Sequence, residues 1–166
     1  MGIAAPEPLL QNHDLSDFCS GRPELDSWLL KKALKSQNRN NAKVYVVRDT
    51  GTQKVIGYYA IAMGSVQREI AIPTLKRNSP NPIPMVVLAR LAVHQEYHGR
   101  GIGAGLLKDC VKRAVYAMEV IGGAGILVHA IDEAAKTFYK KFGFTESGFD
   151  EMTLMARICD IRAAQA

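Results

Sequence analysis

Residues 84–107 place an apolar segment, a glycine-rich loop and the start of a helical pattern in direct succession, and this order constrains the fold more than any other feature. The apolar segment, residues 85–93, is rich in β-branched side chains and only Arg90 interrupts it, which is typical of a buried central strand. A short turn over residues 94–98 follows, and glycine then occupies every second position from 99 to 105. The sequence therefore predicts a strand, a loop and the N-terminus of a helix.

A glycine-rich loop that leads into a helix is suited to binding phosphate. The N–H groups of a first helical turn have no partner within the helix, and the helix dipole favours negative charge beside them. Glycine leaves room for the anion to approach the backbone. Residues 99–104, GRGIGA, lack the GK[ST] ending of a P-loop and do not match the G-x-G-x-x-G dinucleotide signature. Judged from this loop alone, the alternative to phosphate binding is that the glycines only allow a tight turn to close.

The other elements follow from apolar periodicity and from proline, glycine and capping residues. Pro23 suits the first turn of a helix, Asp132 suits an N-cap, and Gly57 and Gly64 are candidates for β-bulges. After a lead-in over residues 1–13, we expect a helix over 20–37 and a hairpin of strands 43–48 and 54–66 that turns at 49–51. A proline-rich linker over 68–84, which is unsuited to a helix, leads to the strand 85–93. We then expect a helix over 101–118, a strand over 126–130, a helix over 132–141, and final strands from 144 onward, of which 152–158 is the clearest. This mixture predicts an α/β or α+β layer on one mixed sheet.

Length and composition favour one globular domain over residues 1–166, because 48% of the residues are hydrophobic and 22% are charged. No apolar run approaches the roughly 18 residues of a membrane span, and no signal peptide is evident, so we expect a cytoplasmic protein without membrane contact. The three scattered cysteines predict buried thiols, and neither they nor His94 and His98 suggest a metal site. A net charge of +5 is compatible with a polyanionic partner but does not require one.

Two segments resemble the motifs of one family. Residues 98–103, HGRGIG, resemble the acyl-CoA loop Q/R-x-x-G-x-G/A of the GNAT acetyltransferase superfamily, with His98 in the polar first position. Residues 132–144, DEAAKTFYKKFGF, resemble the GNAT segment N-x-x-A-x-x-F-Y…GF, with Asp132 in place of asparagine. The two motifs occur in the family's order, with one helix and one strand between them. The resemblance implies a GNAT fold, in which helices flank a mixed central β-sheet, and acetyl-CoA as co-substrate without a metal.

A narrower resemblance covers about four-fifths of the chain, leaving out the first dozen residues and the last, and three stretches carry it. Residues 21–37, residues 77–107 and residues 128–144 resemble the GNAT toxins of bacterial toxin–antitoxin pairs. That resemblance implies an N-acetyltransferase that acetylates the α-amino group of aminoacyl-tRNA and thereby blocks translation. It also implies a homodimer and a neighbouring ribbon-helix-helix antitoxin as partner.

The resemblance also implies roles for individual residues. Tyr139 would be the general acid. Cofactor-binding positions would be Leu91, Ala92, Val93, His98, Gly99, Arg100, Gly101, Gly103, Ala104 and Asp132. Contacts with the RNA backbone would come from Lys32, Lys35, Arg77 and Arg90. Two alternatives remain open on the basic residues: the lysines could only complement a helix dipole, and Arg90 could form a buried structural ion pair.

The chemistry of acetyl transfer bears on the substrate. The attacking amine must be unprotonated, and a lysine side chain has a pKa near ~10.4 whereas an α-amino group lies near ~7.7–8.0. Esterification of the adjacent carboxyl lowers the α-amino pKa further by electron withdrawal. Residues 54–66 and 84–93, which would flank the reaction centre, contain no Asp or Glu, although Glu69 and Glu96 lie just outside them. The absence of a base within these strands favours an amine of low pKa.

Two other functions remain as alternatives. An ordinary GNAT enzyme would acetylate a protein N-terminus or a small amine. A non-catalytic repressor component would need its partner and transfer nothing, but the intact glycines and Tyr139 argue against it. The cluster of basic residues over 31–43 together with Lys76 and Arg77 favours the tRNA-directed enzyme.

Overall fold

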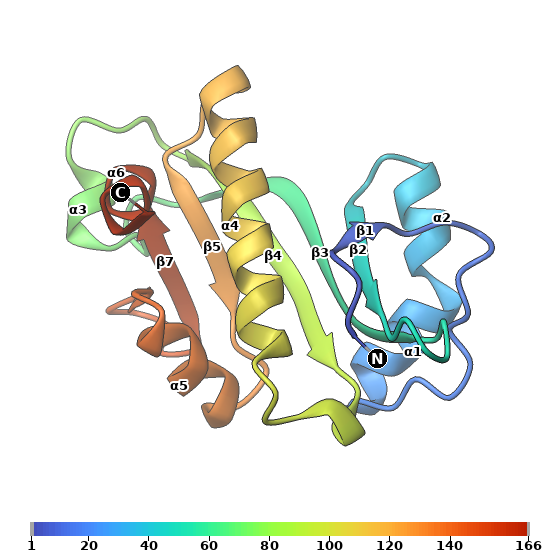
Figure 1. The fold of residues 1–166 in the computed structure, drawn as a ribbon. Helices are drawn as coiled ribbons and strands as arrows, with labels where there is room; N and C mark the ends of the chain where they lie inside the picture. The colour runs from blue at the N-terminus through green and yellow to red at the C-terminus, as the bar shows by residue number, and fades with distance from the viewer. Residues whose placement is uncertain (1, 166) are drawn as a thin grey trace. The chain divides into compact units, whose positions relative to one another are not determined.

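A computed structural model describes residues 2–165, with the backbone alone for residues 162–165. Seven strands occur in the sheet order β1-β2-β3-β4-β5-β7-β6. The chain forms two compact units, the first made of Met1–Ala62 and Ala89–Cys110 and the second of Met63–Leu88 and Val111–Ala166. Three elements run through both units, namely β3 (Val55–Val66), β4 (Ile83–Val93) and α4 (Ile102–Ile121). Figure 1 gives the succession of elements along the chain.

The first unit is built on an antiparallel hairpin. β2 (Lys43–Arg48) pairs with β3, and β1 (Glu7–Pro8) pairs antiparallel with β2 on its other side. The predicted hairpin and its turn are confirmed. β1 lies in the stretch that we expected to be only a lead-in, because a strand of two residues is too short to show an alternating pattern.

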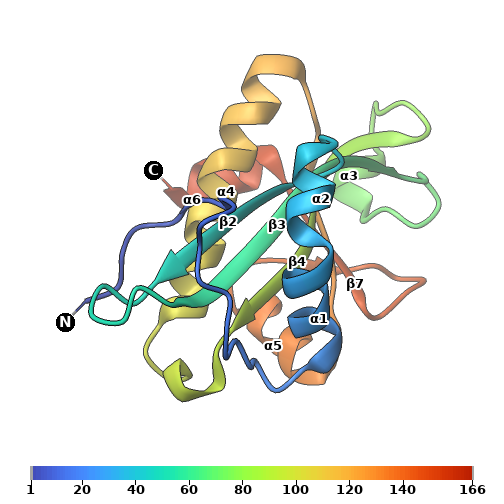
Figure 2. The ribbon, with the colours of Figure 1, turned by 90° about the vertical axis from the view of Figure 1, so that its right-hand side faces the viewer.

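The predicted first helix is broken into α1 (Pro23–Lys31) and α2 (Ala33–Asn38) at Lys32, whose φ is −126° and ψ −23°. Tertiary bonds hold α2 against β2: the Gln37 amide donates to the Leu9 carbonyl (2.7 Å) and accepts from the Val44 N–H (2.9 Å). Figure 2 shows α1 and α2 one after the other, on one side of the strands β2 and β3. Their buried side chains form a core with the strands: Leu25, Leu29, Ala33, Val44, Val46, Tyr58 and Ala60.

Consecutive tyrosines of β3 reach opposite sides of the first unit, as the alternation of a strand requires. The Tyr58 hydroxyl donates to the Leu25 carbonyl of α1 (2.7 Å), and the Tyr59 hydroxyl donates to the carboxylate of Asp109 on α4. Both tyrosines are fully buried. The first half of α4 therefore covers the face of β3 opposite to α1.

The two strand glycines serve close packing rather than the predicted bulges. Val47 pairs with Gly57 and Arg48 with Val55, so the extra residue is Ile56, one position from the expected bulge. A Cβ on Gly57 would lie 3.0 Å from the Val47 Cγ2. A Cβ on Gly64 would lie 2.6 Å from Cγ2 of Val87, in the second unit.

The second unit has a parallel and an antiparallel part. β5 (Gly125–His129) pairs parallel with β4 and antiparallel with β7 (Thr153–Arg157), and β6 (Thr145–Glu146) adds to β7. α5 (Glu133–Lys141) lies between β5 and β6 in the sequence, and α6 (Ile158–Gln165) follows β7. One core lies under the linker segment: Val66, Ala71, Ile72, Leu75, Ile83, Met85, Leu127 and Met155.

Two helices differ from the sequence prediction. The linker that we judged unsuited to a helix contains the single turn α3 (Pro73–Lys76), which begins at a proline and buries Leu75. α6 replaces the end of the predicted strand 152–158. A proline at the first helical position is tolerated because its missing N–H would have no helical partner there. Within the described part of the chain, no helix is long and apolar enough to cross a membrane.

Candidate functional site

The loop before α4 is fixed to the first unit by bonds from several segments. After β4, the His94 N–H donates to the Ile56 carbonyl (2.8 Å) and the Gln95 N–H to the Cys19 carbonyl (2.8 Å). A 3-10 turn, η1 (Gln95–Tyr97), follows, and the Tyr97 hydroxyl donates to the Asp49 carboxylate (2.6 Å). This bond raises the pKa of Tyr97 and lowers the pKa of Asp49. The sequence did not indicate these contacts, because Asp49 appeared only as a turn residue.

Two glycines of the loop adopt backbone conformations that favour glycine and leave open space beside the backbone. Gly99 has φ +81° and Gly101 has φ +77°, a region that other residues rarely adopt, and a Cβ at either position would meet nothing within 4 Å. The helix starts at Ile102, and its first i to i−4 bond runs from the Gly105 N–H to the Gly101 carbonyl (3.0 Å). The N–H groups of Gly103 and Ala104 thus belong to the first turn, which lacks intrahelical acceptors.

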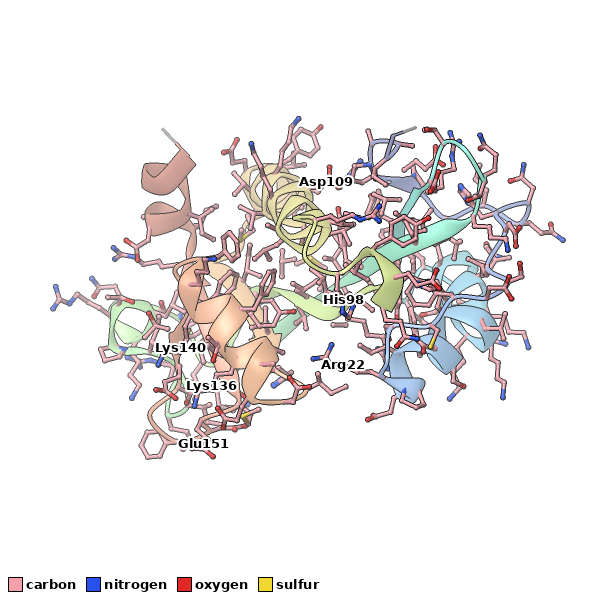
Figure 3. All side chains as sticks on the ribbon, turned by 60° about the horizontal axis from the view of Figure 1, so that its bottom comes forward. Arg22, His98, Asp109, Lys136, Lys140 and Glu151 are labelled. Carbon is pink, nitrogen blue, oxygen red and sulfur yellow. The ribbon has the colours of Figure 1, made fainter. Side chains whose placement is uncertain are left out.

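His98 and Arg100 flank the glycines. The His98 ring Nε2 lies 2.7 Å from the Val93 carbonyl, so this side chain closes the loop on the end of β4. The Arg100 guanidinium lies 5.0 Å from the centre of the Tyr97 ring. Figure 3 shows His98 in the loop and Asp109 further along α4. The polar first position of the motif therefore has a structural role in shaping the loop.

Leu91, Ala92 and Val93 form the end of β4. Ala92 is buried, and Leu91 and Val93 are half-buried. The register between β4 and β5 covers Met85 to Leu88, so the three predicted cofactor contacts lie beyond it. The backbone of such residues is suited to pairing with an extended ligand, in the manner of an added strand.

Tyr139 lies in the second unit, on α5. Its side chain is buried among aromatic rings, with ring centroids 5.3 Å from Phe138 and 5.8 Å from Phe144. Its carbonyl accepts from the N–H groups of Phe142 and Phe144, which ends the helix. Packing therefore fixes the position of the ring, and the role of the hydroxyl stays a prediction.

Asp132 caps α5 as the sequence predicted. Its carboxylate accepts from the Ala135 N–H (2.8 Å), and its own backbone is extended. Asparagine, the usual residue of the motif, would offer the same carbonyl acceptor, which explains why aspartate can stand here. Lys136 and Lys140 follow on α5 (Figure 3), and Lys136 pairs with Glu146 at 2.7 Å.

The four basic residues predicted to contact RNA occupy different surroundings. Lys32 and Lys35 are exposed at the junction of α1 and α2, and Arg77 is exposed after α3 in the second unit. The Arg90 guanidinium lies 4.4 Å from the centre of the Trp28 ring, half-buried. The alternative of a buried ion pair for Arg90 is therefore replaced by a cation–π contact within the first unit.

Histidine and cysteine side chains show no arrangement for a metal. His94 Nε2 lies 2.9 Å from the Asp17 carbonyl, and its Nδ1 accepts from the Glu96 N–H. Among the residues that the structure describes, no three His, Cys, Asp or Glu side chains come together. The cysteines are free; Cys110 is buried as predicted, Cys19 is half-buried, and the prediction of burial is wrong for Cys159, which is exposed on α6.

A strand, a glycine-rich loop and a helix, followed by a second motif that caps a helix carrying a tyrosine, are the features of an acyl-CoA-dependent acyltransferase. The family model described as an acetyltransferase (GNAT) domain matches residues 40–146, and the chain accordingly belongs to the GNAT acetyltransferase family. The predicted fold, with a mixed sheet flanked by helices, is thereby confirmed. The predicted enzyme class, N-acetyltransferase, and the predicted co-substrate, acetyl-CoA, are confirmed as well.

Individual relatives extend this likeness over nearly the whole chain. The chain is 40% identical over 162 residues to the "tRNA-acetylating toxin" of Mycobacterium tuberculosis, covering 98% of this chain and 96% of the relative. A solved structure of AtaT complexed with acetyl-methionyl-tRNAfMet has a TM-score of 0.90 at 26% identity and covers 99% and 100% of the two chains. A variant of the AtaT toxin, bound to the C-terminus of the antitoxin AtaR and acetyl-CoA, has a TM-score of 0.83 at 26% identity and covers 99% and 98%. The predicted resemblance to GNAT toxins is confirmed.

Proposed function

We propose that this protein is a toxin that transfers the acetyl group of acetyl-CoA to the α-amino group of aminoacyl-tRNA and so blocks translation. The observation that carries the proposal is the 40% identity, over 98% of the chain, to a tRNA-acetylating toxin. The matched structure of AtaT with an acetylated methionyl-tRNA supports the same substrate class. Acetylation removes the free amine, and a blocked amine cannot accept the growing peptide.

The cofactor would be held by the loop before α4. The pyrophosphate of acetyl-CoA would accept from backbone N–H groups of the loop and first helical turn, and the helix dipole would add to their attraction. These N–H groups belong to Gly99, Arg100, Gly101, Gly103 and Ala104. The pantetheine arm pairs with the backbone of Leu91 and Val93. Asp132 contributes by fixing the start of α5, the helix that carries Tyr139.

The chemical step joins nitrogen to the acetyl carbon and releases CoA. The neutral amine attacks the thioester carbonyl carbon, and a tetrahedral intermediate forms. The amine loses a proton to solvent, the carbon–sulfur bond breaks, and the Tyr139 phenol gives its proton to the departing thiolate. The Tyr139 phenolate then regains a proton from solvent. A phenol pKa near ~10 against a thiol pKa near ~8.5 makes this transfer only slightly uphill.

The amine needs little help from a base. An esterified α-amino group has a pKa below the ~7.7–8.0 of a free one, so much of it is neutral at physiological pH. Glu69 and Glu96, the acidic residues nearest the flanking strands in sequence, are both exposed and suit at most a proton relay through water. This favours aminoacyl-tRNA over a lysine side chain as acceptor.

The partners follow from the same proposal. A ribbon-helix-helix antitoxin, encoded next to the toxin, would neutralise it; the matched complex of AtaT with the C-terminus of AtaR supports an antitoxin partner. We also propose that the protein forms a homodimer, as its resemblance to GNAT toxins implies. It would act in the cytoplasm, because charged tRNA is found there. Residues 1–166 would act as one catalytic domain.

Mass spectrometry of charged tRNA tests the activity directly. Total aminoacyl-tRNA is incubated with the full chain and acetyl-CoA labelled on the acetyl group, and the aminoacyl ends are then released and analysed. We expect labelled N-acetyl-aminoacyl ends on at least one tRNA. If label appears instead on protein N-termini or small amines added in parallel, the runner-up, an ordinary GNAT acetyltransferase, is correct. Transfer to none of these acceptors would favour the non-catalytic repressor component.

A further inference from the structure

The second unit contains a hollow whose lining is rich in hydrogen-bond donors. Five residues line this hollow of about 380 Å³: Pro73, Thr74, Arg77, Asn78 and Arg157. Two of them carry a guanidinium, one a hydroxyl and one a side-chain amide. The family motifs include none of the five, and only Arg77 was expected to contact RNA.

Arg157 lines this hollow, and its guanidinium has one donor that is not satisfied within the protein. Its Nη2 donates to the Asp160 carboxylate at 2.9 Å, whereas its Nε is buried and has no hydrogen-bond partner among the described residues. A buried N–H without a partner costs free energy, and most such groups in native proteins find an acceptor. The Nε shares the positive charge of the whole guanidinium, and an anionic oxygen is the acceptor that the remaining N–H groups favour most.

The position of Arg157 is fixed by the fold. It is the last residue of β7, opposite Gly125 of β5, and the Ile158 N–H donates to the Ala124 carbonyl (2.8 Å) where α6 begins. The Asp160 carboxylate then holds the guanidinium from the first turn of α6. The forked donor arrangement of Arg157 is therefore pre-oriented.

The other wall of the hollow is a closed turn after α3. Asn78 has φ +57°, so the chain reverses sharply after Arg77. The Ser79 hydroxyl donates to the Leu75 carbonyl (2.5 Å), and the Arg68 guanidinium donates to the Lys76 carbonyl (2.9 Å). These bonds hold the exposed Arg77 on the rim of the hollow. With Asp160 counted, the guanidinium groups leave one net positive charge there.

An exposed aromatic residue near this turn favours nucleic acid as the ligand. The Lys76 ammonium lies 5.6 Å from the centre of the Phe149 ring, and Phe149 is 77% exposed. The Ser147 hydroxyl fixes the loop, since it donates to the Ile70 carbonyl (2.6 Å) and accepts from the Phe149 N–H. An exposed ring beside cations suits stacking of an unpaired base, which an acidic peptide does not offer.

We propose that Arg157 and Arg77 together bind one phosphate of the tRNA backbone in this hollow, with Thr74 and Asn78 as further donors. The inference rests on the proposed function and adds a phosphate site to it. Arginine suits the site because its planar fork matches two phosphate oxygens. The Arg157 side chain is 38% exposed, so the outer part of its guanidinium is accessible to such a phosphate.

The test measures binding of deacylated total tRNA to the full chain at several salt concentrations. The slope of log K against log salt falls by roughly 0.7–0.9 for each phosphate that a variant no longer neutralises. We expect Arg157→Gln and Arg77→Gln each to lower the slope and weaken binding, and the double variant to lose less than the sum of both, because the two residues share one phosphate. Lys112→Gln, which removes an exposed charge from α4, should leave the slope unchanged.

Several results would overturn the inference. A folded Arg157→Gln variant with the parental slope, strict additivity of the two substitutions, or an equal effect of Lys112→Gln would each do so. Arg157→Lys keeps the charge and the fold and should recover only part of the affinity. Should the parent acetylate charged tRNA while Arg157→Gln binds normally, the phosphate site alone is wrong. Should the parent neither bind nor acetylate tRNA, the proposed function fails.

Discussion

Tyr139 is the residue whose role is most specific to the chemistry. Tyr139→Phe keeps the ring that packs against Phe138 and Phe144 and removes only the hydroxyl. Folding and acetyl-CoA affinity should survive, and turnover should fall by about 10²–10⁴, as for a missing general acid. CoA release in the presence of charged tRNA measures turnover, and calorimetry measures cofactor binding. Tyr116→Phe is the matched control, because Tyr116 is exposed on α4 of the same unit. Parental turnover in Tyr139→Phe would leave the residue with a packing role.

Gly103 tests the phosphate-binding loop more cleanly than Gly101. Gly101 has φ +77°, so a valine there would strain the backbone as well as block the anion, whereas Gly103 lies within the first turn of α4. Gly103→Val should abolish acetyl-CoA binding in a folded protein, because its side chain takes the volume of the pyrophosphate. Gly105→Ala serves as control, since its Cβ would meet nothing within 4 Å. Unchanged calorimetric affinity in Gly103→Val would contradict the assignment.

At the level of elements, the turn η1 links the loop to the β2–β3 hairpin through Tyr97 and Asp49. Because this bond lowers the pKa of Asp49, it stabilises the fold above the ordinary Asp pKa of ~3.9 and is lost as the pH falls through the folded value. The same bond raises the pKa of Tyr97, so its stabilisation is present below ~10 and is lost as the pH rises through the folded value. The contribution is therefore greatest between these limits.

Tyr97→Phe should accordingly lower the free energy of unfolding at pH 7 and have a smaller effect at pH 3, where part of the Asp49 contribution is already lost. Urea denaturation at both pH values measures the difference between variant and parent. Acetyl-CoA affinity should also fall at pH 7, because the loop loses its tie to Asp49. An equal loss of stability at both pH values would show that the ring, and not the hydrogen bond, carries the effect.

Local signals predicted most elements but not those that depend on distant partners. β2 matches its predicted range, and Asp132 caps α5, because alternation and capping are encoded within a few residues. The break at Lys32 follows from bonds of Gln37 to Leu9 and Val44, which no local pattern shows.

The candidate site likewise has features that the local sequence predicts and features that depend on distant residues. The glycine loop could be predicted because its conformation depends on its own residues, and the positive φ angles of Gly99 and Gly101 agree with that prediction. The hydrogen bond from Tyr97 to Asp49 could not be predicted, because the two residues lie 48 positions apart in the sequence. The hollow beside Arg157 could not be predicted either, because its lining comes from α3, from the turn after α3 and from the end of β7.

At the scale of the whole molecule, three continuous elements, β3, β4 and α4, each belong to both compact units. A unit that unfolded alone would have to break all three elements within their hydrogen-bonded length. We therefore expect residues 1–166 to unfold as one cooperative domain, as chains of this size commonly do.

Gly64→Ala tests this expectation from the second unit. The added Cβ would lie 2.6 Å from Cγ2 of Val87, and such overpacking costs roughly 1–3 kcal/mol. For a chain of this length, each kcal/mol lowers Tm by about 2–4 °C. The single tryptophan, Trp28, reports on the first unit through its fluorescence, while circular dichroism reports on both. Both signals should shift together to one lower Tm. If Trp28 keeps its parental transition while circular dichroism becomes biphasic, the two units unfold separately and the single domain is wrong.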